Sequence, residues 1–186
     1  MSARFTVIDT TIAGVRLIER QRVGDARGFL ERLFCADELV GAGWVWPIVQ
    51  INRTRTERRG TIRGMHFQRP PAAEAKLVTC VGGAVFDVAL DLRDGSPTYG
   101  QAHAETLSED NRRTLLIPPG CAHGFQALED GAELLYLHSA AYAPAHEGGV
   151  DARDPALGIA WPTADPTLSD RDRGHPAFAA TKAITL

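Results

Sequence analysis

Short apolar runs separated by glycine and proline turns recur along most of this chain, and they constrain its fold more than any other feature. In the clearest run, Val85–Leu92, large apolar residues alternate with Asp87, Ala89 and Asp91, which is the period of a β-strand with two unlike faces. The other strand-like runs are Val7–Ile8, Val15–Ile18, Trp44–Asn52, Leu77–Val81, Gln101–Thr106, Arg113–Ile117, Gly124–Leu128 and Glu133–His138. Many short strands joined by tight turns predict a mainly β chain, folded as a sandwich or a barrel.

Few segments depart from this pattern. Ala36–Val40 carries helix-forming residues before a glycine, and Leu168–Arg173 also favours a short helix. The polar, basic stretch Arg53–Arg58 follows an apolar run, and we expect a solvated loop there. No internal repeat or low-complexity linker divides the 186 residues, so the sequence predicts a single domain over residues 1–186.

The composition excludes several classes of protein. Lys plus Arg total 20 against 23 Asp plus Glu, which gives a formal net charge of −3. This charge provides no general electrostatic attraction to nucleic acid or to an anionic membrane. No stretch approaches the roughly 20 continuous apolar residues of a membrane-spanning helix, and the first residues lack the layout of a secretory signal. Cys35, Cys80 and Cys121 form no CxxC pair, so we expect buried, reduced thiols and a cytoplasmic location.

Three clusters of residues could carry chemistry. The clusters are Arg63–Gln68 with Lys76, Pro118–Phe125 with His123, and Glu133–Tyr136 leading to Tyr142 and Glu147. If their strands line one barrel, His66, Lys76 and Tyr136 point into a shared interior cavity, which is where small barrels hold ligands.

A metal centre is the main alternative for histidines on β-strands. Such sites commonly use two or three histidines with a carboxylate, two of them closely spaced on one strand. The chain has no His-x-His pair, and His66 with His123 would be only a two-ligand remnant. We therefore expect no metal, and we expect the remaining histidines to be structural: His103, His138, His146 and His175.

Taken together, the ordered motifs of the chain resemble the dTDP-4-dehydrorhamnose 3,5-epimerase family of nucleotide-sugar enzymes. The motifs are Gly24–Phe29, Gln50–Asn52, Arg63–Gln68, Lys76–Val78, Val85–Ala89, Asp91–Arg93, Ser96–Gly100, Leu107–Ser108, Ile117–Pro118, Ala122–Phe125, Leu135–Tyr136, Glu147–Gly148, Asp154–Pro155 and Ile159–Pro162. They run in order from about Val7 to Arg173, nearly the whole chain. The resemblance implies a cupin-like β-barrel, or jelly roll, with a few short helices.

The same resemblance implies cofactor-independent epimerisation, at C3 and C5, beside the 4-keto group of a 6-deoxyhexose carried on a nucleoside diphosphate. Removal of a proton next to a ketone leaves an enolate, so the enzyme needs a base, a cation at the enolate oxygen and an acid on the opposite face. His66 matches the family's base, and Asp172 matches the carboxylate that orients it. Lys76 fits the oxyanion partner, and Tyr136 matches the acid.

The resemblance also implies contacts with the substrate and with a second copy of the chain. Arg27, Arg63 and Arg171 suit the diphosphate, because guanidinium groups bind phosphate oxygens in a fork. The other expected substrate contacts are Glu31, Gln50, Asn52, His123, Tyr142 and Glu147. Family members are usually homodimers, and Val7–Ile8 with Val15–Ile18 are the segments expected to pack across the partner.

Other functions stay open on the sequence alone. Ala141 stands where the family often has an aromatic residue, so the sequence leaves the identity of the nucleotide open. It also leaves open whether one carbon or two are inverted. A single-site 3- or 5-epimerase is the first alternative. A non-catalytic sugar-nucleotide-binding protein and a metal-dependent oxygenase of the same fold are the others.

Overall fold

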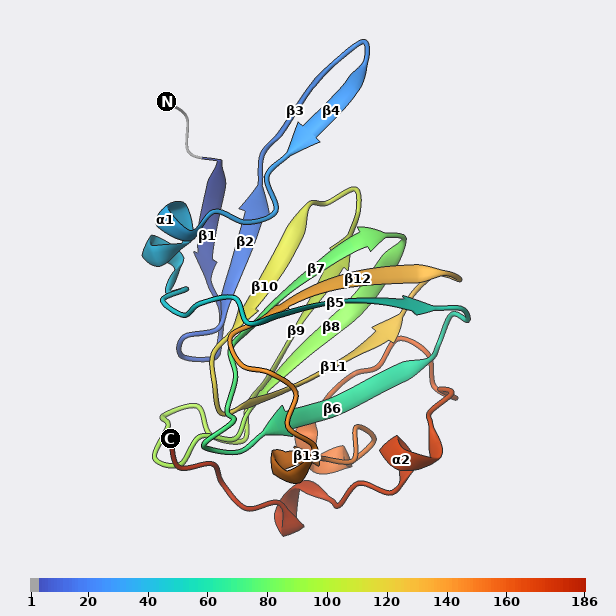
Figure 1. Ribbon diagram of the computed structural model, residues 1–186. Coiled ribbons are helices and arrows are strands. Elements are labelled where there is room, and N and C mark those ends of the chain that lie inside the picture. Colours follow the sequence, from blue (N-terminus) through green and yellow to red (C-terminus); the bar gives the residue numbers. More distant parts are fainter. Residues whose placement is uncertain (1–3) are drawn as a thin grey trace.

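The chain forms two antiparallel β-sheets that face each other, with short helices and loops at their margins (Figure 1). The computed structural model describes residues 4–186. The six-stranded sheet has the order β1 (Phe5–Asp9), β2 (Arg16–Arg20), β10 (Arg113–Ile117), β7 (Lys76–Gly82), β12 (Ala132–His138) and β5 (Gln50–Thr56). The five-stranded sheet has the order β13 (Glu147–Gly149), β6 (Ile62–Gln68), β11 (Cys121–Ala127), β8 (Ala84–Asp91) and β9 (Ala102–Ser108). Over the described residues strand pairing does not close the sheets into one barrel, and the mainly β architecture matches the expected jelly roll.

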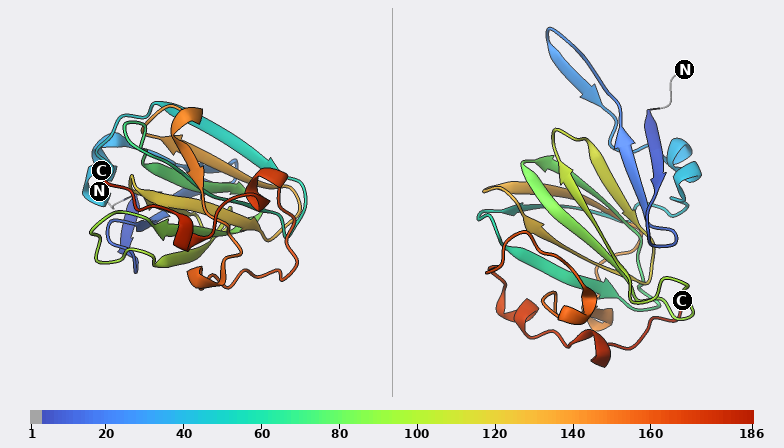
Figure 2. Two further views of the ribbon diagram at one scale, coloured as in Figure 1. Left: turned by 90° about the horizontal axis from the view of Figure 1, so that it is seen from below. Right: turned by 180° about the vertical axis from the view of Figure 1, so that it is seen from behind.

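The remaining elements are short. They are the hairpin of β3 (Arg22–Asp25) and β4 (Gly28–Glu31), then α1 (Ala36–Leu39), η1 (Val40–Ala42), η2 (Pro144–His146), η3 (Pro155–Leu157), α2 (Asp170–Arg173) and η4 (Phe178–Ala180). The β3–β4 hairpin projects away from the two sheets (Figures 1 and 2). Both predicted helices are present as α1 and α2. No helix among residues 4–186 is long and apolar enough to cross a membrane.

The main core lies between the sheets and takes side chains from both. Val78 and Leu134 come from the six-stranded sheet, and Val85 and Phe125 come from the five-stranded sheet. Full burial of such a side chain contributes roughly 1.5–3 kcal/mol. Phe125 also lines the cavity described below, so core and cavity are continuous.

Both sheets are also covered on part of their outer faces. Leu90 of the five-stranded sheet belongs to a cluster with Leu157 and other residues of the last third of the chain. Leu77 of the six-stranded sheet packs in a cluster with Leu39 and Trp44. Where a strand is covered on both faces, polar side chains at its inner positions need partners within the protein.

The alternation predicted for Val85–Leu92 is confirmed, with a different environment for its polar side. Val88 and Leu90 join the outer cluster, whereas Ala89 joins the core between the sheets. Asp87 is fully buried on that inner side. The polar face of this strand therefore points into the protein.

The expectation that Trp44–Asn52 is a strand throughout is wrong. β5 begins only at Gln50, and the preceding residues are irregular. Trp44 and Trp46 pack edge-to-face with ring centroids 5.8 Å apart, so these aromatic side chains fill the outer cluster from a loop.

The expectation that Arg53–Arg58 is a solvated loop is also wrong. β5 continues to Thr56 and pairs along its length with β12. Arg53 and Arg55 both form ion pairs with Glu133 of β12. Cross-strand pairs of opposite charge thus help to hold this segment in the sheet. The segment lacks the apolar residues by which a strand is usually recognised in a sequence.

The cysteines are free, as expected. Cys80 and Cys121 are buried, whereas Cys35 is only half-buried.

Strands β6 and β11 approach each other closely at two glycines. A Cβ atom on Gly124 would lie 2.7 Å from Met65 Sδ and 3.1 Å from Gly64 Cα. The same strands carry His66 and His123, which face each other in the strand register. Glycine at position 124 therefore sets the spacing between two side chains of the cavity.

Gly124→Ala should lower the unfolding free energy by about 1–3 kcal/mol, because the added methyl group has no room. Urea denaturation measures this change. Gly41→Ala is the matched control, since a Cβ atom there would meet nothing within 4 Å. Equal stability of the Gly124→Ala and Gly41→Ala variants would contradict the close approach.

Candidate active site

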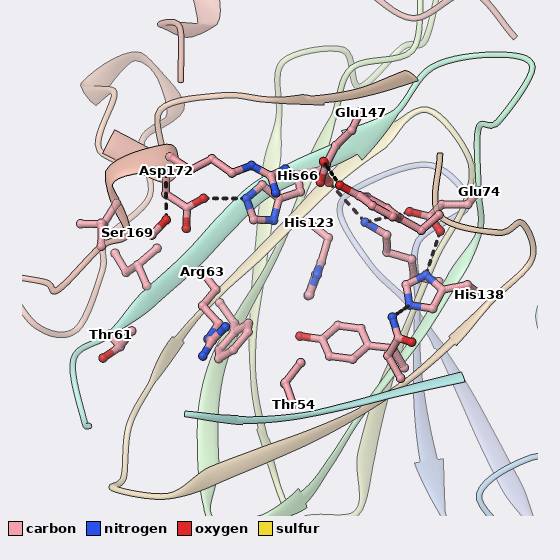
Figure 3. A pocket seen from close by; sticks show the side chains of 18 of the residues that line it. Thr54, Thr61, Arg63, His66, Glu74, His123, His138, Glu147, Ser169 and Asp172 are labelled. Carbon is pink, nitrogen blue, oxygen red and sulfur yellow. Dashed lines mark hydrogen bonds and ion pairs between the residues drawn. The ribbon is translucent and has the colours of Figure 1, made fainter. Parts of the chain in front are cut away.

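A cavity of about 670 Å³ opens between the two sheets (Figure 3). Its walls come from β5, β7 and β12 of one sheet, from β6 and β11 of the other, and from the segment that leads into α2. The predicted site residues that line it are Gln50, Asn52, Arg63, His66, Lys76, His123, Tyr136, Tyr142, Glu147, Arg171 and Asp172. The topology thus brings together side chains that lie far apart in the sequence.

His66 and Asp172 form a hydrogen-bonded pair in one wall of the cavity. His66 Nε2 lies 2.8 Å from Asp172 Oδ1. With Nε2–H donating to the carboxylate, Nδ1 is the ring nitrogen left to accept a proton. The His66 side chain is 30 % exposed and the Asp172 side chain is buried, so the imidazole faces the cavity and shields the carboxylate.

The first turn of α2 holds the Asp172 carboxylate in place. Ser169 is the N-cap residue, and its Oγ accepts a hydrogen bond from the Asp172 backbone N at 3.1 Å. Burial alone would raise the pKa of Asp172, but the hydrogen bond and charge of His66, with the backbone N–H of Gly64, outweigh it and lower the pKa. Asp172 is therefore ionised at neutral pH and can stabilise a protonated His66.

His175, which we expected to be structural, lies against this pair. Its ring centroid is 5.4 Å from that of His66, and its Nε2 is 3.6 Å from Asp172 Oδ1. Within residues 4–186 these three side chains bring ligand atoms close enough to surround a metal ion. However, two ligands held tetrahedrally by zinc lie roughly 3.3 Å apart, and the 2.8 Å contact between His66 and Asp172 is a hydrogen bond. The geometry favours a proton-sharing pair over a metal centre.

Tyr136 enters the cavity from the opposite sheet, on β12. Its ring centroid lies 5.7 Å from that of His123 and 5.8 Å from that of His138. Burial, and then the negative charge of Asp87, raise the pKa of Tyr136 far above its ordinary value. Its phenol therefore stays protonated at neutral pH and can act as a proton donor.

A second histidine–carboxylate pair, His123 with Asp87, lies next to the Tyr136 ring. His123 Nε2 lies 2.7 Å from Asp87 Oδ1, and both side chains are buried. Asp87 fixes the orientation of the His123 ring. The sequence signal for Asp87 is an acidic residue inside the apolar alternation of its strand.

Sequence reasoning missed two titratable residues of the cavity, Glu74 and His138. Lys76 Nζ lies 3.3 Å from Glu74 Oε1 and 3.3 Å from the carbonyl oxygen of His66. Glu74 Oε2 lies 2.8 Å from His138 Nδ1. His138 follows Tyr136 by two residues on one strand and so shares its face. That spacing is the signal that could have identified it.

Polar side chains at another part of the cavity wall are linked to one another. The Tyr142 hydroxyl donates a hydrogen bond to Glu147 Oε2 at 2.7 Å, and Arg171 forms an ion pair with the same carboxylate. Gln50 Oε1 accepts a hydrogen bond from the Tyr142 backbone N. Burial would raise the pKa of Glu147, but Arg171 and Tyr142 outweigh it and lower the pKa.

Two predicted substrate contacts, Arg27 and Glu31, lie outside the cavity. Both belong to the projecting β3–β4 hairpin. Arg27 forms an ion pair with Asp25 at the hairpin turn, and Glu31 lies near Arg20 and Arg22. Within a single chain, the structure does not bring these two residues to the others.

Asp172→Asn should destabilise the protein in a pH-dependent way. The pKa of Asp172 in the folded protein lies below its ordinary value of 3.8. Its stabilising contribution is therefore present above about pH 4 and is lost as the pH falls through the folded value. Urea unfolding should show a constant deficit from about pH 7 to about pH 5, and a shrinking deficit below about pH 4.

Asp170→Asn, in the same helix, is the control, because the Asp170 side chain is fully exposed. A deficit for Asp172→Asn that stays constant down to about pH 3 would contradict the depressed pKa.

Comparison with known proteins identifies the family. The family model described as dTDP-4-dehydrorhamnose 3,5-epimerase matches residues 9–180. A dTDP-4-dehydrorhamnose 3,5-epimerase of Streptomyces griseus is 44% identical over 171 residues, which are 91% of this chain and 84% of that protein. A dTDP-4-dehydrorhamnose 3-epimerase of Streptomyces niveus is 40% identical over 188 residues, covering 94% of this chain and 90% of that protein.

A solved structure agrees with the sequence relatives. The crystal structure of dTDP-6-deoxy-D-glucose-3,5-epimerase from Legionella pneumophila, in complex with dTDP-4-keto-L-rhamnose, matches with a TM-score of 0.92 and 35% identity. The match covers 98% of this chain and 98% of that chain. The resemblance expected from the motifs is thus confirmed, and the chain belongs to the dTDP-4-dehydrorhamnose 3,5-epimerase family of isomerases.

Proposed function

We propose that the chain is a cofactor-independent epimerase acting at C3 and C5 of a nucleotide-linked 4-keto-6-deoxyhexose, of the kind that converts dTDP-4-dehydro-6-deoxyglucose to dTDP-4-dehydrorhamnose. The observation that carries this proposal is that His66 and Tyr136 enter one cavity from opposite sheets. A base and an acid on opposite faces of a carbon are what inversion at that carbon requires. The names of the relatives support the substrate class.

The reaction begins when His66 Nδ1 takes the proton from the carbon beside the ketone. The electron pair of that C–H bond forms a C=C bond, and the carbonyl electrons move to oxygen, which gives an enolate. Asp172 stabilises the imidazolium by accepting the bond from Nε2 at 2.8 Å. The Lys76 ammonium supplies positive charge at the enolate oxygen.

Inversion follows when Tyr136 donates its proton to the opposite face of the same carbon. The electron pair of the C=C bond forms the new C–H bond, and the ketone is restored. The raised pKa of Tyr136, caused first by burial and then by Asp87, keeps the proton on the phenol until the enolate takes it. The phenolate and the imidazolium then return to their starting states by proton exchange with water.

The rest of the cavity suits a nucleotide sugar. Arg63 and Arg171 line it and are proposed to hold the diphosphate. The residues proposed to contact the sugar and the base are Gln50, Asn52, His123, Tyr142 and Glu147.

A single-site epimerase is the second candidate, because the Streptomyces niveus relative is named a 3-epimerase. Both reactions use the same base and acid and differ in which carbon lies between them. Epimerisation in heavy water distinguishes them, since inversion at C3 and C5 introduces two deuterium atoms and inversion at one carbon introduces one.

We also propose that the chain is a single domain that works in the cytoplasm. The core between the sheets takes side chains from both, so neither sheet buries its inner face alone. The three cysteines are free, which suits a reducing compartment.

A homodimer, in which the β3–β4 hairpin of one chain completes the cavity of its partner, is proposed as the working form. The hairpin projects from the sheets (Figure 2), and its Phe29 and Leu30 are 56% and 63% exposed. Val7 and Ile8 on the edge strand β1 are also exposed. Apolar side chains exposed together in this way are typical of an interaction surface, and a partner's cavity would give Arg27 a substrate to bind.

His66→Ala should abolish both epimerisation and deuterium uptake from heavy water, because no enolate forms without the base. Tyr136→Phe keeps the ring and its packing but loses the donor on the far face, so His66 can still remove a proton and return a deuteron to the same face. This variant should therefore take up deuterium while forming far less inverted product. NMR and mass spectrometry of the recovered sugar measure both outcomes.

Two results would contradict these roles. If Tyr136→Phe blocked deuterium uptake as completely as His66→Ala, Tyr136 would belong to the base. If Tyr136→Phe retained full inversion, another donor, such as Tyr142 or water, would be the acid.

If the protein is a homodimer, the molecular mass from light scattering should be about twice the 20.1 kDa of one chain. Co-expressed Arg27→Ala and His66→Ala chains should also recover about a quarter of the wild-type activity. Half of the dimers are mixed, and each mixed dimer has one cavity with both His66 and the partner's Arg27. A fully active monomer, or no recovery in the mixture, would refute the shared site.

A further inference from the structure

Glu74 and His138 lie side by side in the cavity wall (Figure 3) and have no role in the steps above. With Lys76 they form a buried, connected group. The side chains of Glu74, His138 and Lys76 are 8%, 11% and 9% exposed, respectively. Lys76 lies in β7 and His138 in β12, which pair in register at these two residues. The group therefore sits at a fixed position on the six-stranded sheet.

Two of the three N–H donors of Lys76 have partners in the protein. An ammonium group has three donors and no acceptor. Nζ lies 3.3 Å from Glu74 Oε1 and 3.3 Å from the carbonyl oxygen of His66. With two donors directed by acceptors on different elements, the direction of the third is fixed, and Lys76 lines the cavity.

Glu74 can direct Lys76 because its own carboxylate is held at both oxygens. Oε1 faces Lys76, and Oε2 accepts a hydrogen bond from His138 Nδ1 at 2.8 Å. On the other side of the ring, His138 Nε2 lies 3.5 Å from Asn52 Nδ2. The imidazole is thereby held from both nitrogens.

His138 also connects this group to the proposed acid. Its ring stacks on that of Tyr136, with centroids 5.8 Å apart and planes inclined by 18°. One set of contacts therefore fixes the ammonium group and the phenol relative to each other.

Glu74 carries the negative charge that this role needs. Burial alone would raise the pKa of Glu74, but the hydrogen bond from His138 and the charge of Lys76 outweigh it and lower the pKa. The carboxylate is ionised at neutral pH and accepts strong, charge-assisted hydrogen bonds.

We propose that Glu74 and His138 are positioning residues of the epimerisation, which hold the Lys76 ammonium so that its third N–H faces the carbonyl oxygen of the substrate. The inference rests on the proposed function, since it assigns the enolate oxygen as the target of that N–H. Glu74 and His138 act through Lys76 and Tyr136 and do not touch the reacting atoms.

The proposal separates effects on catalysis from effects on binding. Negative charge builds up on the carbonyl oxygen only as the enolate forms, so a misdirected ammonium weakens the transition state more than the bound substrate. Loss of the positioning residues should therefore lower kcat and leave KM nearly unchanged.

Glu74→Gln tests this with little change of shape, because the amide retains one acceptor and loses the charge and the second acceptor. We expect kcat, followed as deuterium uptake and as inverted product, to fall roughly 10- to 100-fold, with KM within about threefold of wild type. Glu133→Gln is the matched control. Glu133 lies on β12 and forms ion pairs with Arg53 and Arg55 away from the cavity, and its variant should keep wild-type kcat.

A double-mutant cycle distinguishes positioning from a general structural role. In a Lys76→Met background, Glu74→Gln should lower kcat by less than about twofold more, because the group it positions is already gone. A further loss as large as that of Glu74→Gln alone would overturn the proposal. So would a Glu74→Gln enzyme with wild-type kcat, or one with raised KM and unchanged kcat.

His138→Phe provides an independent variant should Glu74→Gln fail to fold. It keeps an aromatic ring against Tyr136 and removes the Nδ1–H bond to Glu74. We expect kcat to fall roughly 10-fold without a further loss in the Lys76→Met background, and wild-type kcat would overturn the proposal. Failure of the wild-type enzyme itself to epimerise the dTDP-linked keto sugar would instead refute the proposed function.

Discussion

A charged group between two β-sheets is costly unless it has a partner, because each unpaired ion out of water costs several kcal/mol. The contact between His66 and Asp172 meets this requirement and also joins two parts of the molecule. The imidazole comes from β6 and the carboxylate from α2, near the end of the chain. Leu168, just before that helix, packs with the outer face of the five-stranded sheet. Site and fold therefore depend on the same contact, since the segment that supplies the carboxylate also covers the sheet that supplies the histidine.

A hydrogen-bonded histidine–carboxylate pair occurs three times around the cavity. The pairs are His66 with Asp172, His123 with Asp87, and His138 with Glu74, joined at 2.8, 2.7 and 2.8 Å. In each pair the histidine and the carboxylate come from different elements, so each ring has its orientation set by tertiary structure. A cavity lined by such fixed dipoles and charges needs little reorganisation when charge develops on a substrate, which is the condition for strong electrostatic stabilisation of an enolate.

Much of this could be predicted from the sequence, and the exceptions have physical causes. Alternation in Val85–Leu92 identified a strand with two faces, but a periodic pattern cannot say that its polar face is turned inward. Arg53–Arg58 resembled a loop because the residues that hold it in the sheet are charges paired with Glu133 across the strands. The spacing of His138 from Tyr136 could have placed it on the cavity side of its strand, but its contact with Glu74 joins residues 64 positions apart in the sequence. Local patterns carry no information about such contacts.

The resemblance assigned His66 as base and Tyr136 as acid without giving a physical reason for that division. The division comes from the neighbours of each group, because burial raises the pKa of both Tyr136 and Asp172. Burial raises the pKa of Tyr136, and the nearby Asp87 raises it further, so the phenol keeps its proton. Burial acts in the same direction on Asp172, but its contact with His66 overcomes it, so the carboxyl group loses its proton. One wall of the cavity thus holds an ionised carboxylate beneath an imidazole, and the facing sheet holds a protonated phenol. These opposed environments support the proposal that His66, paired with Asp172, is the base and that Tyr136 is the acid.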